Sequence, residues 1–216
     1  MNQTRSSANG IDSETEITLG VLNAVHENSA VTQRSVAQEL GIALGLANAY
    51  LKRCVKKGYI KVTQIPANRY AYYLTPTGFA EKSRLTTQYL TMSFDFFRHA
   101  RTQCGAVFAD CETHGWRRVA LVGVSDLGEI ATLCARDHDV ELRGFLDSSH
   151  DTDQFAGLPV AALPADLAPV DAWVVTDLSR PQETFDAVAA QVQADCVLAP
   201  ALLNISRSDG GGDAAP

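Results

Sequence analysis

A proline-free segment of helical pattern, residues 77–113, divides this chain into two parts with different hydrophobic periods. Its apolar residues recur every three or four positions, which predicts one continuous helical stripe. That stripe consists of Leu85, Tyr89, Met92, Phe96, Ala100, Cys104, Val107 and Cys111. A helix this long in a chain of 216 residues favours packing on a second subunit, so we expect a homodimer. Packing on the protein's own core is the alternative.

The part before this segment predicts three helices and a two-stranded ribbon. Apolar residues near 17–25 form the first stripe, and Thr32 resembles the N-cap of a short second helix. A third helix covers about 43–57, and strand patterns follow at 59–65 and 70–74. We expect the third helix to face the first two with Leu46, Tyr50, Leu51, Cys54 and Val55. This order of elements is typical of a winged helix-turn-helix.

The charge is divided unevenly between the two parts. Residues 1–100 hold 11 Lys and Arg against 7 Asp and Glu, whereas residues 101–216 hold 7 against 18. Such asymmetry indicates two domains with different partners, and a basic domain suits a polyanion.

Candidate contacts to double-stranded DNA lie on the second and third helices and on the ribbon. Small residues early in the third helix permit entry into the major groove, Asn48 can pair with adenine, and Lys52 can reach bases or phosphates. Backbone N–H groups at the start of the second helix can hold a phosphate. The full set is Gln33, Arg34, Ser35, Gly45, Asn48, Lys52, Arg53, Lys56 and Arg69. An ordinary solvated basic face is the alternative.

Three runs carry a resemblance to a known family: residues 33–48, residues 51–61 and residues 73–82. They resemble the winged-helix regulators of the MarR superfamily, in particular those associated with exopolysaccharide genes. The resemblance covers about residues 15–90 and implies a transcriptional regulator that binds DNA. Two positions depart from the pattern, because Leu46 stands where a polar residue is expected and the short wing carries one arginine, Arg69.

After residue 115 the pattern changes to strands that alternate with helices. Strand patterns cover 119–124, 142–146, 172–176 and 196–199, and helical patterns cover 126–136 and 182–193. This alternation predicts an α/β domain with a parallel sheet.

A glycine-containing loop follows the first of these strands and opens a helix. It is the place of a phosphate loop, and Asp147 at the end of the next strand can accept ribose hydroxyl groups. The candidate ligand-binding residues are Gly123, Val124, Ser125, Asp126, Leu127, Gly128 and Asp147. Ser125 replaces the middle glycine and hinders backbone approach to a pyrophosphate, although its hydroxyl can bind phosphate. The alternative is a tight turn in a scaffold domain that binds no small molecule.

This half resembles the Rossmann domain of Rex-type redox-sensing repressors, and also CoA-binding folds and the nucleotide-binding domains of sugar acyltransferases. The matching stretches are residues 119–128, the strand ending at Asp147, residues 157–160 and residues 196–204. The resemblance implies NAD(H) or another nucleotide as ligand, and Ser125 departs from it.

Other classes of protein are not favoured. Residues 83–216 contain no lysine, and the histidines lack a partner acid or a metal-ligand spacing, so we expect a sensor without catalytic or metal-binding residues. A nucleotide-dependent enzyme of sugar or polysaccharide metabolism with a fused regulatory head is the alternative. The five cysteines include no CxxC pair, and no segment predicts a signal peptide or a membrane span. We therefore expect a cytoplasmic protein without membrane contact.

The predicted organisation has five parts, and the fold class is an α+β winged helix-turn-helix domain, a long helical linker and an α/β Rossmann-like domain. The parts are a tail at 1–12, the DNA-binding domain at 13–76, a dimerisation helix at 77–114, the ligand-binding domain at 115–206 and a tail at 207–216.

Overall fold

The computed structural model describes residues 13–65 and 69–207, with the side chains of Ile65 and Arg69 left out. The chain divides into two compact units, Met1–Asp95 and Phe96–Pro216. The tails predicted at 1–12 and 208–216, and most of the turn between the two ribbon strands, lie outside the described residues.

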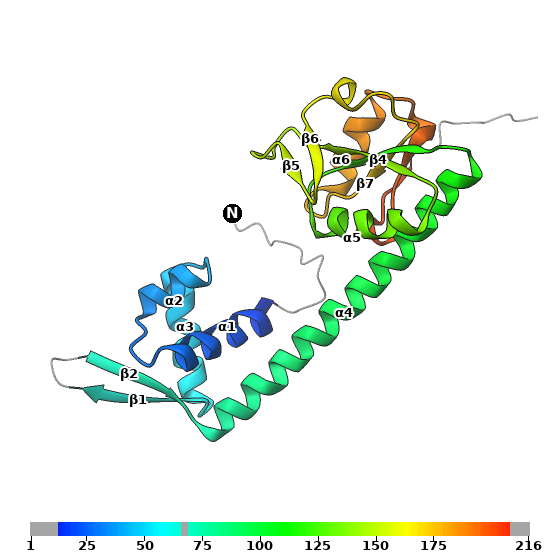
Figure 1. Ribbon diagram of the computed structural model, residues 1–216. Helices are drawn as coiled ribbons and strands as arrows, with labels where there is room; N and C mark the ends of the chain where they lie inside the picture. Colours follow the sequence, from blue (N-terminus) through cyan, green and yellow to red (C-terminus); the bar gives the residue numbers. More distant parts are fainter. Residues whose placement is uncertain (1–12, 66–68, 208–216) are drawn as a thin grey trace, which may run out of the picture. The chain divides into compact units, whose positions relative to one another are not determined.

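The first unit contains the helices and the ribbon that the sequence predicts (Figure 1). In chain order they are α1 (Ser13–Glu27), α2 (Gln33–Glu39), α3 (Leu44–Lys56), β1 (Ile60–Ile65) and β2 (Arg69–Leu74). The two strands are antiparallel, with Ile60 opposite Leu74 and Val62 opposite Tyr72. The order is that of a winged helix-turn-helix.

A capping box begins α2. The Thr32 hydroxyl accepts a hydrogen bond from the Ser35 N–H at 3.0 Å, and the Ser35 hydroxyl oxygen accepts one from the Thr32 N–H at 2.9 Å. These bonds satisfy two donors that a helix N-terminus otherwise leaves unpaired, which fixes the start of this seven-residue helix. Val36 and Ala37 of α2 are buried in the core of the unit.

The buried face of α3 differs from the one predicted. Ala47, Leu51 and Cys54 are buried, whereas Leu46 and Val55 are 40% and 37% exposed. Residues 47, 51 and 54 follow the spacing of four and three that keeps side chains on one helical face. Leu46 and Val55 stand one position before and one position after members of that set, which turns them away from the core.

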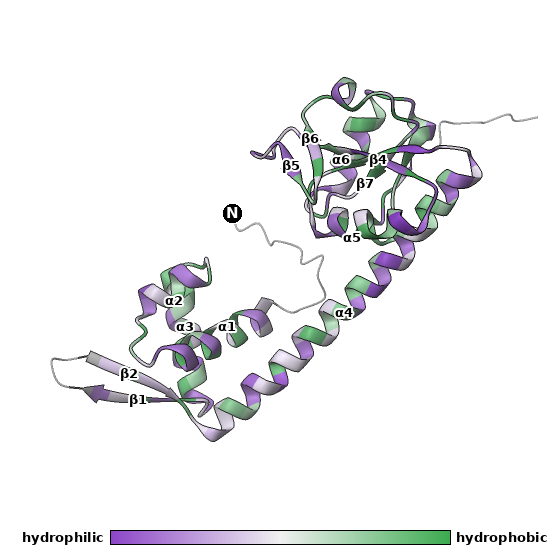
Figure 2. Cartoon of the chain, viewed as in Figure 1, coloured by the Kyte–Doolittle hydropathy of each residue, from purple (hydrophilic) through white to green (hydrophobic). Residues whose placement is uncertain are grey.

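A single helix, α4 (Pro76–Thr113), runs from the first unit into the second. The hydroxyl of Thr75 accepts a hydrogen bond from the Gly78 N–H at 3.0 Å and so caps the first turn. Leu85 is buried in the first unit, and Ala100, Cys104, Phe108 and Cys111 are buried in the second. Four apolar residues of the middle, Tyr89, Leu90, Phe94 and Phe97, are exposed. Apolar and polar residues alternate along this helix in Figure 2.

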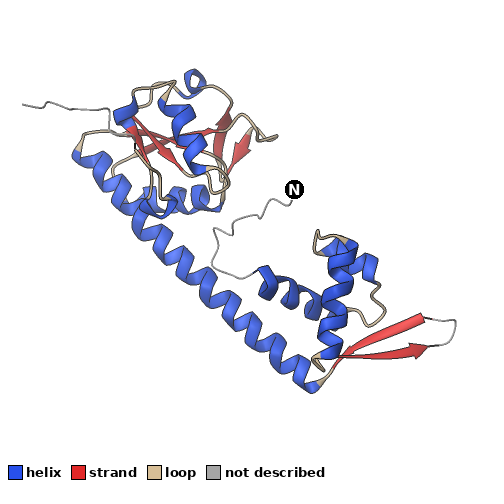
Figure 3. Cartoon of the chain, turned by 180° about the vertical axis from the view of Figure 1, so that it is seen from behind, coloured by secondary structure: helices blue, strands red, loops and turns tan. Residues whose placement is uncertain are grey.

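The second unit is built on a six-stranded sheet with the order β5-β6-β4-β3-β7-β8. Figure 3 shows its strands with the helices of the unit beside them. The strands are β3 (Arg118–Val122), β4 (Glu141–Leu146), β5 (Gln154–Phe155), β6 (Leu158–Ala161), β7 (Ala172–Val175) and β8 (Val197–Leu198). The α-helices are α5 (Asp126–Cys134) and α6 (Pro181–Ala189), and short 3₁₀ turns cover Ala135–Asp137, Pro164–Leu167, Ala194–Cys196 and Ala201–Leu203. The four predicted strands are present, and the hairpin of β5 and β6 is an addition.

All strands except β5 pair in parallel. The chain leaves β3 toward β4 and β6 on one side, and then returns to β7 and β8 on the other side. The sheet therefore has a switch point between β3 and β7. In open α/β sheets, ligands bind outside the carboxyl ends of the strands at such a point.

Within residues 13–65 and 69–207, no helix combines the length and the apolar composition that a bilayer crossing needs.

Candidate nucleic-acid interface and ligand pocket

One face of α3 carries four of the predicted DNA contacts. Gly45, Asn48, Lys52 and Lys56 are separated by three, four and four residues, which places them on the same side of the helix. Gly45 and the two lysines are exposed, and Asn48 is half-buried. In the described part of the chain, neither lysine forms an ion pair. This face therefore presents two free cations to solvent.

A groove separates this face from the ribbon. Its volume is about 380 Å³, and it is lined by Gln33, Asn48, Leu51, Lys52, Val55, Lys56, Val62, Tyr70 and Tyr72. The Oδ1 atom of Asn48 is buried there without a hydrogen-bond partner among the described residues. Sequence analysis did not select the ribbon tyrosines, although the two-residue period of a strand places Tyr70 and Tyr72 on the same face as Val62.

Arg53 lies apart from the other predicted contacts. Its Nη2 atom forms an ion pair with Oε1 of Glu14 in α1 at 2.5 Å. Arg53 stands one position, about 100°, after Lys52 around the helix. The structure thus groups this arginine with α1 and separates it from the Gly45–Lys56 face.

The three predicted DNA contacts at the start of α2 differ in whether their hydrogen-bonding groups are free to bind a phosphate. Ser35 is engaged in the capping box, because its N–H donates to Thr32 and its hydroxyl donates to the Thr32 carbonyl oxygen at 2.9 Å. A phosphate site on these N–H groups was predicted, and the cap occupies one of them. Gln33 and Arg34 are exposed. Arg69 begins β2, and its side chain lies outside the described residues.

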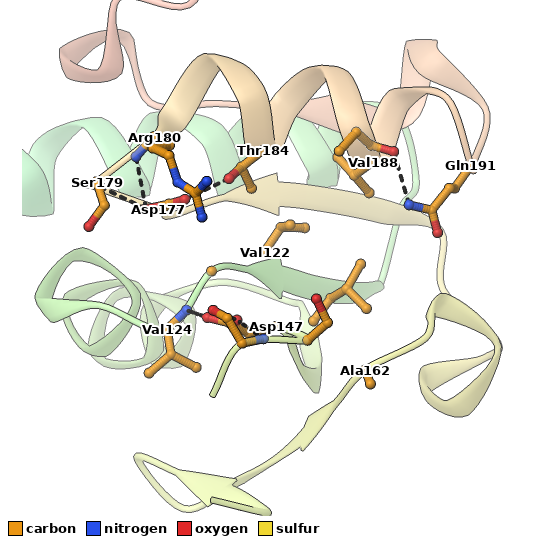
Figure 4. A pocket seen from close by; sticks show the side chains of 15 residues that line it. Val122, Val124, Asp147, Ala162, Asp177, Ser179, Arg180, Thr184, Val188 and Gln191 are labelled. Atoms are coloured by element: carbon orange, nitrogen blue, oxygen red, sulfur yellow. Dashed lines mark hydrogen bonds between the residues drawn. The ribbon is translucent and has the colours of Figure 1, made fainter. Parts of the chain in front are cut away.

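The second site lies at the carboxyl ends of β3, β4 and β7. A pocket of about 360 Å³ opens there, lined by Val122, Gly123, Val124, Leu146, Asp147, Ser148, Ser149, Ala162, Asp177, Ser179, Arg180, Thr184, Ala187, Val188 and Gln191. Figure 4 shows Asp147 beside Val124, and Asp177 near Ser179, Arg180 and Thr184. Three of the seven predicted ligand residues, Gly123, Val124 and Asp147, line this pocket.

Gly123 is required by its backbone and by its neighbour. Its φ is +96°, and a methyl group at this position would lie 2.6 Å from the Asp177 Cβ. A larger residue would be strained and would also push away the segment at Asp177 that follows β7. The predicted role of Gly123 in a tight turn is thus matched by its geometry.

The other four predicted ligand residues do not line the pocket. The Ser125 hydroxyl donates to the Thr176 carbonyl oxygen at 2.5 Å and accepts from the Gly128 N–H at 3.2 Å, so it caps α5. Its one hydrogen is therefore used, which removes the donor expected to bind phosphate. Leu127 and Gly128 are buried in the core, and Asp126 is exposed outside the pocket.

The Asp147 carboxylate accepts hydrogen bonds from the loop after β3 and from the turn that follows β4. One carboxylate oxygen accepts the Val124 N–H at 3.0 Å, and the other accepts the N–H and hydroxyl of Ser149 at 2.9 and 2.7 Å. Burial favours the neutral form of this carboxyl, but these hydrogen bonds outweigh it and hold the pKa of Asp147 below its ordinary value. The carboxylate is therefore charged near neutral pH.

Asp177 makes a matching arrangement on the other side of the loop, and sequence analysis missed it. Its Oδ1 accepts the N–H groups of Ser179 and Arg180 at 2.7 and 3.3 Å, and its Oδ2 accepts the Thr184 hydroxyl at 2.6 Å. The sequence does place Asp177 directly after a predicted strand, the same position that led to the selection of Asp147.

Within residues 13–65 and 69–207, no three side chains among His, Cys, Asp and Glu come together in a way that suits a metal ion.

Comparison with protein families agrees with the fold of the first unit. Residues 14–61 match the model of a family described as winged helix-turn-helix DNA-binding. The match contains all of α2 and α3 and the start of β1. A comparison with curated proteins gives no match.

Solved structures of bacterial proteins that are similar to this chain include PcaV, MepR and FabT. PcaV from Streptomyces coelicolor with its natural ligand is 23% identical over 38% of this chain and 59% of its own, with a TM-score of 0.35. MepR, a regulator of the Staphylococcus aureus multidrug efflux pump MepA, is 24% identical over 40% and 64%, with a TM-score of 0.34. FabT from Streptococcus pneumoniae in complex with DNA is 20% identical over 42% and 63%, with a TM-score of 0.32. The chain therefore spans less than two thirds of each of these proteins.

Proposed function

We propose that this protein is a transcriptional regulator of the MarR type that places α3 in the major groove of duplex DNA. The observation that carries the proposal is the α3 face of Gly45, Asn48, Lys52 and Lys56, exposed at the glycine and both lysines, within a region that matches a DNA-binding family. A small residue near the start of the helix permits close approach, the amide can read a base edge, and the lysines neutralise phosphates.

The ribbon contributes to the same interface in this proposal. Tyr70 is 56% exposed and lines the groove beside Lys52 and Lys56. A tyrosine hydroxyl can donate to a phosphate oxygen, so the wing contacts DNA through Tyr70 as well as through Arg69.

A homodimer is part of the proposal. Tyr89, Leu90, Phe94 and Phe97 are 41%, 46%, 58% and 37% exposed along the middle of α4. A second copy of the helix would cover these side chains and remove apolar area from water. A dimer with two winged helices would bind two half-sites of a pseudo-palindromic operator.

The second unit serves as a sensor in this proposal. Its pocket lies at the switch point of a parallel sheet, where such sheets bind small molecules. The effector is a nucleotide-type or sugar-linked metabolite, and the resemblance to Rex-type domains makes NAD(H) the first compound to test. Effector binding changes the DNA affinity through a coupling free energy, without turnover by this chain.

The test measures binding of the full chain to a labelled 30-base-pair duplex by fluorescence anisotropy across a salt series. Affinity should fall linearly on a logarithmic salt scale, because lysines release counterions from the phosphates. Lys52→Ala should reduce both the affinity and the slope. Binding that is absent at low salt, or that does not depend on salt, would contradict the proposal.

A further inference from the structure

We propose that the pocket of the second unit binds the hydroxyl groups of a sugar ring, in a free sugar or a nucleoside, and excludes phosphate from the Gly123–Val124 loop. This inference rests on the sensor role proposed above and names the class of its ligand. It departs from a dinucleotide, which would place its pyrophosphate on this loop.

Three backbone donors of the pocket are already used by carboxylates of the protein. A phosphate loop binds its ligand through N–H groups that point at the phosphate oxygens. Here the Val124 N–H donates to Asp147, and the N–H groups of Ser179 and Arg180 donate to Asp177. The protein thus supplies its own anions at the positions where phosphates would find donors.

The same two carboxylates repel an incoming anion. Asp147 accepts a hydrogen bond from Val124, while a methyl group on Gly123 would touch Asp177, so the carboxylates stand on either side of this loop (Figure 4). A phosphate on the loop would lie between two negative charges in a partly buried site, where repulsion is less screened than in water.

The single arginine of the pocket, Arg180, does not make it a phosphate site. Arg180 is the one positively charged residue among those that line the pocket, and its Nη1 atom lies 3.4 Å from the Glu183 carboxylate. This guanidinium is therefore already paired with Glu183 of α6, and it faces two carboxylates in the pocket, Asp147 and Asp177.

The remaining hydrogen-bonding capacity of the pocket suits hydroxyl donors. A carboxylate has about four acceptor sites. Asp147 uses three of them for Val124 and Ser149, and Asp177 uses three for Ser179, Arg180 and Thr184. Each carboxylate thus keeps about one site for a ligand. Two hydroxyl groups of a ligand would satisfy both.

The rest of the lining is compatible with such a ring. Apolar side chains are supplied by Val122, Leu146 and Val188, and polar ones by Ser148 and Gln191. The volume of about 360 Å³ lies at the lower end of the range of roughly 300–1,000 Å³ that small-molecule sites occupy. A pocket of this size favours a sugar or a nucleoside over a dinucleotide.

Isothermal titration calorimetry on the full chain with matched pairs of probes tests the inference. The neutral members are adenosine, uridine, glucose and galactose, and the phosphorylated members are AMP, UMP, glucose 1-phosphate and galactose 1-phosphate, with NADH as a further probe. We expect at least one neutral probe to bind, and its phosphorylated partner to bind at least about tenfold more weakly, as expected for like charges. Which neutral probes bind distinguishes a free sugar from a nucleoside.

A pair of charge-removing variants adds a second readout. Asp177→Asn should weaken binding of the neutral probe about tenfold, because one charge-assisted hydrogen bond becomes a neutral one. It should also narrow the difference between the neutral and the phosphorylated probe. Asp186→Asn is the matched control, since Asp186 lies on α6 nine residues after Asp177, is exposed and does not line the pocket. If Asp177→Asn does not fold, the probe pairs on the natural chain still decide.

Each result has one meaning. Tighter binding of a phosphorylated probe or of NADH would overturn phosphate exclusion and leave the sensor role intact. Failure of every neutral probe to bind would overturn the ligand class, and failure of all probes would contradict the sensor role as well. DNA binding is measured separately and is unaffected by these outcomes.

Discussion

Arg53 forms an ion pair with Glu14, the second residue of α1, with 2.5 Å between Nη2 and Oε1. Its neighbour Lys52 lies on the groove beside the ribbon and forms no ion pair in the described part of the chain. Two adjacent cations of one helix therefore serve different surfaces, which gives the proposed DNA interface a control within the same helix.

Replacing Lys52 by alanine should weaken DNA binding uniformly across sequences and reduce the salt slope by about one, because one phosphate contact is lost. Arg53→Ala removes the same charge from the α1 side of the helix and should leave both quantities nearly unchanged. Fluorescence anisotropy with a duplex at several salt concentrations compares the two variants. Equal losses of DNA affinity in both variants would show that binding depends on net charge and not on the position of Lys52.

Replacing Gly45 by alanine should separate stability from DNA binding. No atom lies within 4 Å of the position that a Cβ would take, so the helix accepts the methyl group. The free energy of unfolding should rise by about 0.5 kcal/mol, because alanine loses less backbone entropy than glycine. DNA affinity should fall, since the methyl group stands on the face that enters the groove. Thermal melting and anisotropy measure the two effects, and unchanged affinity would remove Gly45 from the interface.

The same substitution at Gly128 should have the opposite effect on stability. A methyl group there would lie 2.6 Å from Cε1 of Phe145, in the buried core beside the loop. Overpacking of this kind lowers the free energy of unfolding by about 1–3 kcal/mol. Urea unfolding of Gly128→Ala measures the loss. A variant as stable as the natural chain would mean that the core around Phe145 accommodates the methyl group without strain.

The ion pair of Arg118 and Asp171 should make the second unit sensitive to acid. Hydrogen bonds from the Arg118 guanidinium, and then from the N–H groups of Arg118 and Arg117, hold the pKa of Asp171 at about 2, below its ordinary 3.8. Because the folded-state pKa is lowered, the stabilisation is present above about pH 4 and is lost as the pH falls toward 2.

Asp171→Asn isolates this effect from other titrations. The variant should be less stable than the natural chain by about 1–2 kcal/mol at pH 7. That difference should shrink below pH 4, because the Asp171 carboxyl of the unfolded natural chain takes up a proton there while the folded one stays charged until about pH 2. Denaturant unfolding at pH 7, 4 and 3 gives the three differences. A constant difference at all three pH values would contradict the role of the charge.

Cys104 and Cys111 should be unreactive in the folded protein. Both are fully buried, and burial raises the pKa of each thiol to about 12, so almost no thiolate exists at pH 8. We expect neither to react with Ellman's reagent at pH 8 until the chain is unfolded in guanidinium. Rapid reaction of both in the native state would contradict their burial.

Much of this fold could be predicted from local patterns. The cap at Thr32, the proline-free run of α4 and the alternation of strands and helices each follow from short-range chemistry, and each is present in the structure. The hairpin of β5 and β6 was missed because its strands are short and depend on pairing with β4. Leu46 and Val55 were assigned to the core because several registers of one helix look apolar, and only packing on α1 and α2 selects the one that contains Ala47.

The sequence by itself determined the α-helices, every strand except β5 and β6, the glycine of the turn at Gly123 and the part of the chain that is basic, because these depend on neighbours along the chain. Only the tertiary structure decided that Arg53 pairs with α1 while Lys52 stays free, and that Asp147 and Asp177 occupy the loop donors. Val124 lies 23 residues from Asp147, and Glu14 lies on another helix than Arg53, so no local pattern records these two contacts. The donors to Asp177 are close in sequence, at Ser179 and Arg180, but only the fold brings this turn to the pocket beside Gly123. Charge and hydrogen bonding act through space, and the fold sets those distances.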